Sequence, residues 1–359
     1  MDFSIQELAL IAIALDDEEA TTVKKKRRFS VHPTWHKREQ EGEYHTLYKE
    51  LLDDETQFYQ YFRMTKECFA LLEKILSPHL HKKDTVMKRA ITPRERLAVC
   101  IRYLATGDSH LSISFSYRLG HTTVNKIVKE TCKIIVEQLM SDMLPEMTTE
   151  MWKSVAEDFW LLWKFPNCLG ALDGKHVVIE APPNSGSLFF NYKSTFSIVL
   201  LALVDAKCNF IYVNVGAQGR NHDAGIFTNS SLGQRLMNGT LNVPQDRNLP
   251  GTNIIAPFVI IGDSAFPLKT YLLRPYPYNS GNREYDVFNY RLGLARRCVE
   301  NAFGILTQKF RIYQGRIKMN PDSVDNVILT TCILYNFIRK KCENDVHQNN
   351  TLQDSSLNN

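Results

Sequence analysis

Three acidic residues, each within a predicted strand or helix or just after one, are the first candidate functional residues in this sequence. Asp173 lies in an apolar segment and is followed by a glycine, and Asp263 comes directly after the apolar run 258–262. Glu300 lies within a long helical pattern, off its apolar stripe. A buried carboxylate needs a compensating partner, and a metal ion is one of the few partners that suits several acids at once. Asp173, Asp263 and Glu300 therefore predict a shared metal site.

An oxygen-only set of ligands indicates which metal and which reaction to expect. Carboxylates favour Mg²⁺ or Mn²⁺ over softer metals. A pair of such ions, about 3.5–4 Å apart, can activate a water molecule or a 3′-hydroxyl and stabilise the leaving oxygen of a phosphodiester. The eight cysteines include no C-x-x-C pair and no compact cluster with histidine at zinc-ligand spacing. The predicted chemistry is that of a nuclease or a strand-transfer enzyme.

Asp223 is a fourth acid with two interpretations. It stands in the segment 219–224, at the start of a helix expected over residues 224–237. Aspartate is strongly favoured as a helix N-cap, so a purely structural cap is one interpretation. The exit of the preceding strand is also a place from which a carboxylate could reach a metal ion. The residues alone leave both interpretations open.

The segments that carry these acids have the pattern of an α/β fold. From Cys168 onward the period changes from helical to extended, and a short turn at 205–209 joins two extended runs at hairpin spacing. We expect the first three strands to be antiparallel. The expected strands cover residues 168–179, 197–204, 210–215 and 258–262, and the expected helices cover 224–237, 285–310 and 324–341. This order is compatible with a ribonuclease-H-like mixed sheet flanked by helices.

Residues 35–150 are expected to form an all-helical domain in front of the sheet. Apolar residues keep helical spacing there, and Thr65 and Thr92 mark helix starts. A helix at 111–118, a glycine turn and a second helix at 122–136 have the pattern of a helix-turn-helix. The outward face of the second helix would suit a DNA groove and consists of Thr123, Asn125, Lys126, Lys129 and Lys133. The alternative is an ordinary corner between two helices.

Both ends of the chain are expected to lack a fixed structure. Residues 1–34 form a flexible segment with five consecutive cations at 24–28, which indicate either a nuclear import signal or a solvated charged stretch. Residues 342–359 are polar enough to stay disordered. No apolar run reaches the roughly 20 residues needed to cross a bilayer, so no membrane association is predicted. The net charge of +4 is a weak signal by itself.

Several blocks resemble, in the right order, the motifs of PIF/Harbinger transposases and of the nucleases derived from them. Residues 165–176 look like the first catalytic motif of that family, and further similar blocks lie at 191–200, 219–227, 262–268 and 297–304. The resemblance implies a DDE endonuclease domain over residues 165–340 that binds a divalent metal ion. It implies Asp173, Asp263 and Glu300 as catalytic residues and metal ligands, with Asp223 as an additional ligand.

The same resemblance implies a setting and partners. These are DNA as the substrate, a nuclear location with the cytoplasm as a second compartment, and a Myb/SANT-like partner protein that supplies DNA recognition. Basic residues near the acids would place positive charge beside scissile phosphates; they are Lys175, His176, Lys193, Arg220, His222, Arg296 and Arg297. Each could equally be a solvated charge or an ion-pair partner.

Two functional hypotheses follow from these observations. The first is an active metal-dependent nuclease that hydrolyses phosphodiester bonds or transfers DNA strands. The second is a domesticated, catalytically silent DNA- or protein-binding nuclear protein that keeps the fold. The presence of all the acids favours the first hypothesis. The target DNA and a homo-oligomeric state are left open by the sequence.

Overall fold

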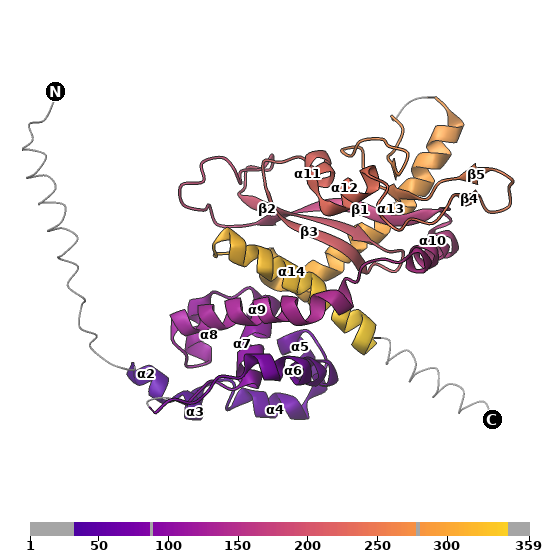
Figure 1. Ribbon diagram of the computed structural model, residues 1–359. Helices are drawn as coiled ribbons and strands as arrows, with labels where there is room; N and C mark the ends of the chain where they lie inside the picture. Colours follow the sequence, from indigo (N-terminus) through magenta and orange to yellow (C-terminus); the bar gives the residue numbers. More distant parts are fainter. Residues whose placement is uncertain (1–31, 87–88, 278–280, 344–359) are drawn as a thin grey trace, which may run out of the picture.

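The computed structural model describes residues 32–86, 89–277 and 281–343. The basic run 24–28 and the tail beyond residue 343 lie outside the described residues, so the expectations for these segments stay predictions. The described residues form a group of N-terminal helices and a mixed sheet with helices on both faces (Figure 1). This confirms the predicted α/β class, and the architecture is consistent with a ribonuclease-H-like fold.

The N-terminal helices precede the sheet along the chain. Side-chain caps explain where several of them begin: Thr65 accepts the N–H of Cys68, and Thr92 accepts the N–H of Glu95 in front of a helix that begins with proline. Both starts agree with the expected ones. The helices are α2 (Pro33–His36), α3 (Arg38–Glu41), α4 (Leu47–Asp53), α5 (Glu55–Phe62), α6 (Lys66–Leu80), α7 (Pro93–Thr106), α8 (His110–Ser116), α9 (His121–Met143) and α10 (Thr149–Trp163).

Helices α8 and α9 form the predicted helix, turn and helix, joined by residues 117–120. Val124 and Ile127 of α9 are buried as expected. The side-chain amide of Asn125 lies 3.3 Å from Nδ1 of the buried His110. Because this contact engages the amide nitrogen, Asn125 is less free to hydrogen-bond a DNA base than the sequence suggests. DNA binding by this motif therefore stays a prediction that rests mainly on the lysines of α9.

The main sheet has five strands in the order β3, β2, β1, β6 and β7. Strand β1 (Cys168–Val178) pairs antiparallel with β2 (Ser197–Val204), and β2 pairs antiparallel with β3 (Phe210–Gln218). On its other side β1 pairs parallel with β6 (Val259–Ile261), which pairs parallel with β7 (Leu272–Leu273). The antiparallel arrangement of the first three strands is confirmed, and the sheet is mixed as predicted.

Helices cover both faces of this sheet (Figure 1), and a hydrophobic core lies on each face. Successive residues of a strand point to opposite faces, so Ile198 of β2 packs in the larger core with α13, α14 and the N-terminal helices. Its neighbour Val199 packs in the smaller core with α11 and α12. Helix α14 contacts both β3 and α9 and thereby joins the two parts of the chain. The helices are α11 (Asp223–Asn229), α12 (Ser231–Met237), α13 (Arg283–Lys309) and α14 (Pro321–Ile338).

Some expected elements differ from the structure. The single helix expected at 224–237 is two helices, because Ser230 leaves the helical conformation and caps α12 by accepting the N–H of Gly233. Strand β3 continues past residue 215 to Gln218. The shortest elements carry no periodic pattern and are absent from the expected set. Besides β7 they are β4 (Arg247–Asn248), β5 (Ile255–Ala256), the 3₁₀-helix η1 (Arg311–Gln314) and the π-helix η2 (Arg339–Glu343).

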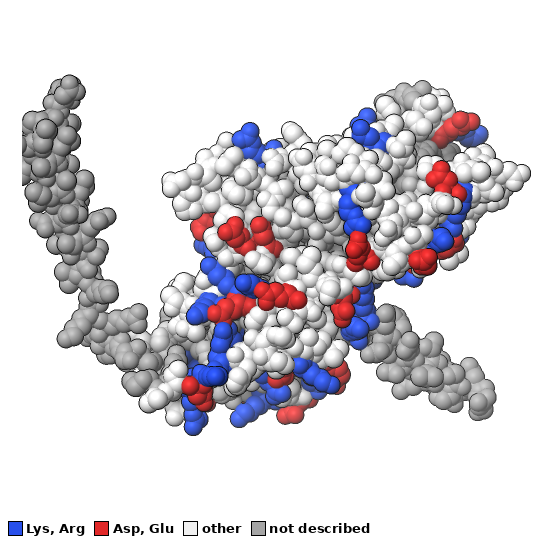
Figure 2. All heavy atoms as spheres, viewed as in Figure 1, with Lys and Arg blue, Asp and Glu red and all other residues white. Residues whose placement is uncertain are grey.

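Acidic and basic side chains are intermixed over the N-terminal helices on the face shown in Figure 2. On α9, Lys126 lies 3.7 Å from Glu130 and Lys133 lies 3.8 Å from Glu137. Two lysines of the predicted DNA-binding face are therefore partly neutralised by their own helix. Within the described ranges, no helix combines the length and the apolar character that a membrane span needs.

Candidate active site

Asp173 stands in the middle of β1, opposite Ala202 of β2. Because strands alternate and Ala171 packs in the larger core, the Asp173 side chain projects to the face covered by α13. The side chain is only 20% exposed, and one carboxylate oxygen accepts the backbone N–H of Gly174 at 2.9 Å. The strand thus holds a carboxylate inside the sheet, as the sequence predicts.

The electrostatics of Asp173 connect it to the other acids. Burial raises the pKa of this carboxyl to about 6; the nearby Arg296 cation and the Gly174 N–H lower it, and Asp263 and Asp223 raise it. Mutual influence of this kind requires the acids to lie near one another. The structure therefore brings Asp173, Asp223 and Asp263 into one electrostatic neighbourhood.

The raised pKa predicts that Asp173 lowers the stability of the metal-free protein at neutral pH. The carboxyl is protonated in folded and unfolded chains below about pH 3.8, and folding must tolerate a buried charge once the pH rises through about 6. In EDTA at pH 7.5, Asp173→Asn should therefore raise the free energy of unfolding by about 1–3 kcal/mol. Urea denaturation at pH 7.5 and pH 4 measures this difference.

The gain should disappear at pH 4, where the wild-type carboxyl is largely protonated in the folded state. Glu300→Gln is the matched control, because that side chain is 59% exposed and its removal should give no comparable gain. An Asp173→Asn protein that is less stable than wild type at pH 7.5 would contradict this account of the site.

Asp263 lies two residues after the end of β6, the strand next to β1, with Gly262 between them. Its Oδ1 accepts the backbone N–H of Ala265 at 2.9 Å, which fixes the tight turn after the strand. Gly262 permits this turn, since a Cβ at that position would lie 2.8 Å from the ring of Phe266. The carboxyl end of such a strand is where open α/β sheets build their sites, and Asp263 has the predicted position.

Asp223 is the first residue of α11, whereas His222 occupies the N-cap position without a side-chain cap bond. The N-cap interpretation of Asp223 is therefore wrong. Its carboxylate lies against β1 instead: a Cβ on Gly174 would stand 2.5 Å from Asp223 Oδ1. Burial raises the pKa of Asp223, and Asp263 raises it further. Since Gly174 and Asp173 alternate along β1, Asp223 approaches this strand from the face opposite to the Asp173 side chain.

Glu300 projects from α13, and Arg296 lies one turn before it on the same helix. The guanidinium of Arg296 lies between two predicted ligands: Nη1 is 3.9 Å from Glu300 Oε1, and Nη2 is 3.7 Å from Asp173 Oδ2. Both distances exceed hydrogen-bond length, and the buried Nε has no hydrogen-bond partner among the described residues. Arg296 is thus a loosely held cation rather than a locked salt bridge.

The residues can be tested for their fit to a metal ion. Among the described residues, no three acidic, histidine or cysteine side chains stand close enough to share one as they are placed. Their chemistry nevertheless suits a hard divalent cation. The donors are carboxylate oxygens, two of the acids have raised pKa values, and Arg296 supplies the positive charge between Asp173 and Glu300. A bound divalent cation would likewise compensate the negative charge of these carboxylates.

Comparison with known proteins identifies the part of the chain that contains these acids. Residues 172–336 match the family described as the DDE superfamily endonuclease. This chain carries a DDE superfamily endonuclease domain. The matched segment begins one residue before Asp173 and includes Asp223, Asp263 and Glu300.

Related proteins agree with this assignment. "Protein ALP1-like" from Arabidopsis thaliana is 28% identical over 255 residues, and the match spans 68% of this chain and 60% of that protein. "Putative nuclease HARBI1" from Mus musculus is 23% identical over 296 residues, or 81% of this chain and 80% of the mouse protein. No solved structure gives a significant match. The predicted kinship with Harbinger-type, transposase-derived nucleases is confirmed.

Basic side chains of the DDE domain gather toward the end of β1. Burial lowers the pKa of both Lys175 and His176, and the positive charge of Lys193 lowers both further. His176 Nδ1 lies 2.9 Å from Ser197 Oγ on β2. Lys175 and His176 on β1 and Lys193 in the loop that follows therefore lie within electrostatic reach of one another, and their contact with DNA phosphates stays a prediction.

A loop beside this cluster presents an aromatic residue that the sequence reasoning missed. The buried amide of Asn191 accepts the backbone N–H groups of Lys193 and Thr195 and donates to Ser197, which fixes the loop. Tyr192 is 79% exposed, and the centroid of its ring lies 5.5 Å from that of His176 in an edge-to-face arrangement. An exposed aromatic ring among cations is a common contact for nucleic acid bases. The Asn-Tyr-Lys run was the available sequence signal.

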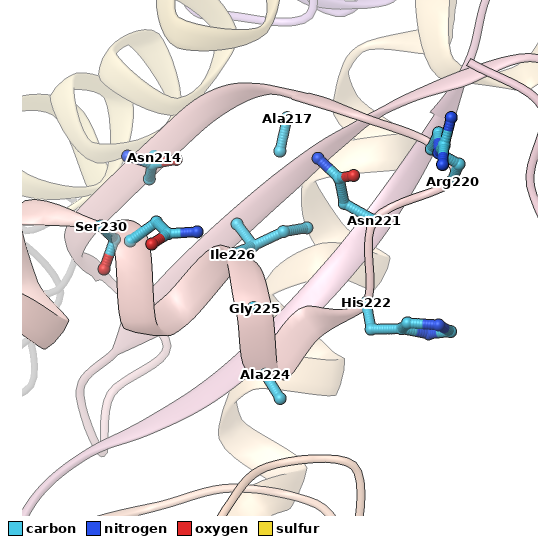
Figure 3. Close-up of a pocket in the computed structure, with 10 residues that line it drawn as sticks. Asn214, Ala217, Arg220, Asn221, His222, Ala224, Gly225, Ile226 and Ser230 are labelled. Carbon is cyan, nitrogen blue, oxygen red and sulfur yellow. The ribbon is translucent and has the colours of Figure 1, made fainter. Parts of the chain in front are cut away.

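The loop before α11 and the helix itself border a cavity of about 760 Å³ between β3 and α11 (Figure 3). Arg220, Asn221 and His222 reach this cavity from the loop, and Asn214 reaches it from β3. Arg220 and His222 are therefore not beside Asp173 itself but next to Asp223. Arg297 is exposed on α13, one residue after the Arg296 that enters the acid cluster.

Proposed function

We propose that this protein is a nuclease that acts on DNA with a divalent metal ion held by Asp173, Asp263 and Glu300. One observation supports the proposal most strongly. Asp173 is an acid buried inside β1 whose pKa is raised to about 6 by burial and, to a lesser degree, by Asp263 and Asp223, and a loosely held arginine lies 3.7 Å from its carboxylate. Strongly perturbed acids in one cluster are typical of functional sites. The DDE endonuclease domain supplies the reaction class.

The residues of the site have separate roles in this proposal. Asp173 and Asp263 hold the metal from neighbouring strands, and Glu300 completes the set from α13. The bound Mg²⁺ or Mn²⁺ supplies activation of a water molecule or 3′-hydroxyl and stabilisation of the leaving oxygen. Lys175 and Lys193 orient the DNA backbone by charge. Asp223, on the other face of β1, adds negative charge to the neighbourhood and is the least direct ligand.

A plasmid assay tests the proposal. Purified protein is incubated with supercoiled plasmid in Mg²⁺, in Mn²⁺ and in EDTA, alone and with a Myb/SANT-like partner. Nicking or linearisation in either metal, lost in EDTA, is the expected result. If the wild-type protein cleaves no DNA under any of these conditions, the enzymatic proposal is wrong and the protein is catalytically silent.

The catalytically silent alternative has one observation in its favour. In the described residues the acids do not converge on a single point, and Arg296 provides the charge compensation between Asp173 and Glu300. A protein that no longer binds metal could keep such an arrangement. The behaviour of Arg296 therefore discriminates between the two functions.

Arg296 should act as a replaceable cation if the acids bind metal. In EDTA, Arg296→Gln removes the compensating charge beside Asp173 and should lower the free energy of unfolding by about 1 kcal/mol. In Mg²⁺ the loss should largely vanish, so the metal-induced rise in melting temperature exceeds that of wild type. Thermal denaturation in both buffers measures this, with Arg297→Gln, an exposed neighbour, as the control. An equal loss in both buffers would mean that Arg296 is purely structural.

We also propose a nuclear setting with a Myb/SANT-like partner protein. The proposal is supported by the resemblance to Harbinger-type proteins and by the cations at 24–28. Imaging of a fluorescent fusion with and without a candidate partner tests it. Location in the nucleus should be unchanged by Asp173→Ala and lost when the five cations are replaced, and a cytoplasmic wild type in both conditions would contradict it.

A further inference from the structure

The cavity between β3 and α11 has the lining of a binding site that the proposed catalytic residues do not use (Figure 3). Its volume of about 760 Å³ is in the range of sites for small organic groups. Apolar surface comes from Ala217, Ala224 and Ile226. Gly225 adds no side chain, and a Cβ there would meet nothing within 4 Å. A flat ring therefore has room between the strand and the helix.

Amide groups are the polar feature of this cavity, supplied by Asn214, Asn221 and Asn229. Ser230 is not available to a ligand, because its hydroxyl donates to Phe227 O and accepts the N–H of Gly233. Among the described residues, the side chains of Asn221 and Asn229 show no hydrogen bond, and both residues are exposed. Figure 3 shows Asn221 extending toward the space between β3 and α11. An amide offers one donor and one acceptor side by side, which matches the edge of a nucleobase.

A cation stands at the rim of the same cavity. Arg220 is exposed, and its guanidinium has no ion pair with any described residue. Guanidinium groups bind phosphate oxygens well. The next but one residue, His222, points away from α11 in Figure 3 and adds a second basic group to the rim. The lining thus combines an apolar slot, free amides and a phosphate-binding group.

The cavity is joined to the acid cluster through Asp223. His222 and Ala224, the two neighbours of Asp223, both line the cavity. The cavity lies on the face of the sheet that Asp223 approaches, opposite to the face of the Asp173 side chain, so a nucleotide there would be held beside Asp223.

From these contacts we infer that the cavity binds one unpaired nucleotide of the DNA substrate, with the base between β3 and α11 and its phosphate at Arg220. The inference rests on the proposed action on DNA. A base that lies between β3 and α11 must be unpaired, because a base in a duplex is stacked between its neighbours and cannot enter a cavity of the protein. The amides of Asn221 and Asn229 read the edge of that base.

Binding measurements in EDTA test this inference without requiring cleavage. Fluorescence anisotropy gives the affinity for a labelled single-stranded oligonucleotide and for a strand of the same length with abasic sites, over a series of salt concentrations. The double variant Asn221→Ala/Asn229→Ala should bind the normal strand about tenfold more weakly, with an unchanged salt dependence. Its affinity for the abasic strand should equal that of wild type. Asn238→Ala, an exposed asparagine outside the cavity, is the matched control.

Arg220→Gln should behave differently from the amide variants. It should weaken binding of both strands and lower the slope of log affinity against log salt by about 1, as expected for one lost phosphate contact. Equal weakening of both strands by the asparagine variant, or no weakening, would overturn the inference while DNA binding itself persists. Failure of wild type to bind any DNA would instead overturn the proposed function, and this inference with it.

Discussion

Asp173→Asn and Asp263→Asn are each expected to lower metal-dependent DNA cleavage on the order of a thousandfold or more. An amide keeps the shape of the carboxylate but removes the charge that holds a divalent cation. Glu300→Gln should have a similar effect, because its carboxylate is the ligand on α13. Initial rates of plasmid nicking at saturating Mg²⁺ or Mn²⁺ measure these losses.

Asp223 is proposed to be a less direct metal ligand than the other three acids, and this difference provides an internal control. Asp223 lies on the opposite face of β1, so Asp223→Asn should cost less, roughly 10- to 100-fold. Asp246→Asn, at an exposed position with no hydrogen bond among the described residues, should leave the rate unchanged. Equal rates for wild type and all three variants of Asp173, Asp263 and Glu300 would remove these residues from catalysis.

Asn336→Ala is expected to lower the free energy of unfolding by roughly 3–5 kcal/mol. Asn336 is completely buried on α14, where its Oδ1 accepts the N–H of Phe210 at 3.0 Å. Its Nδ2 donates to the carbonyls of Met143 at 2.9 Å and Phe210 at 2.8 Å. The amide therefore ties the end of α9 to the start of β3. Removing it takes the partner from the backbone N–H and carbonyl of Phe210, whereas the Met143 carbonyl keeps a hydrogen bond from Lys340 Nζ at 3.2 Å.

Urea or thermal denaturation of the full chain measures this loss. Asn326→Ala on the same helix is the matched control, because its amide makes one exposed hydrogen bond to Asp322 and should cost at most about 0.5 kcal/mol. A destabilisation by Asn336→Ala no larger than that of the control would show that α14 does not depend on this amide to join the helices to the sheet.

Local pattern was enough to predict much of the fold. The continuous apolar run of β2 is buried on both faces, and its expected bounds agree with the structure. The long helix expected at 285–310 is α13, displaced by only a residue or two, because its apolar stripe repeats over many turns. Elements of two residues, such as β7, contain too few positions for any period to emerge.

The candidate site was predictable only in part, because its geometry depends on contacts between distant segments. Asp173 and Asp263 could be placed from the apolar residues that precede each of them. The approach of Asp223 to Gly174 could not, since the helix that carries Asp223 crosses a strand about 50 residues earlier in the chain. Arg296 was one of several basic candidates, and only its spacing of four residues from Glu300 hinted at a special position.

The most direct test of the metal site is the anomalous scattering of Mn²⁺ in crystals of the wild-type protein grown or soaked with that ion. We expect a Mn²⁺ peak bound directly by carboxylate oxygens of Asp173 and Asp263 on the side of Glu300, with the Arg296 guanidinium displaced from its position between Asp173 and Glu300. A fully soaked crystal with no peak at these carboxylates, and with Arg296 still between them, would contradict the account.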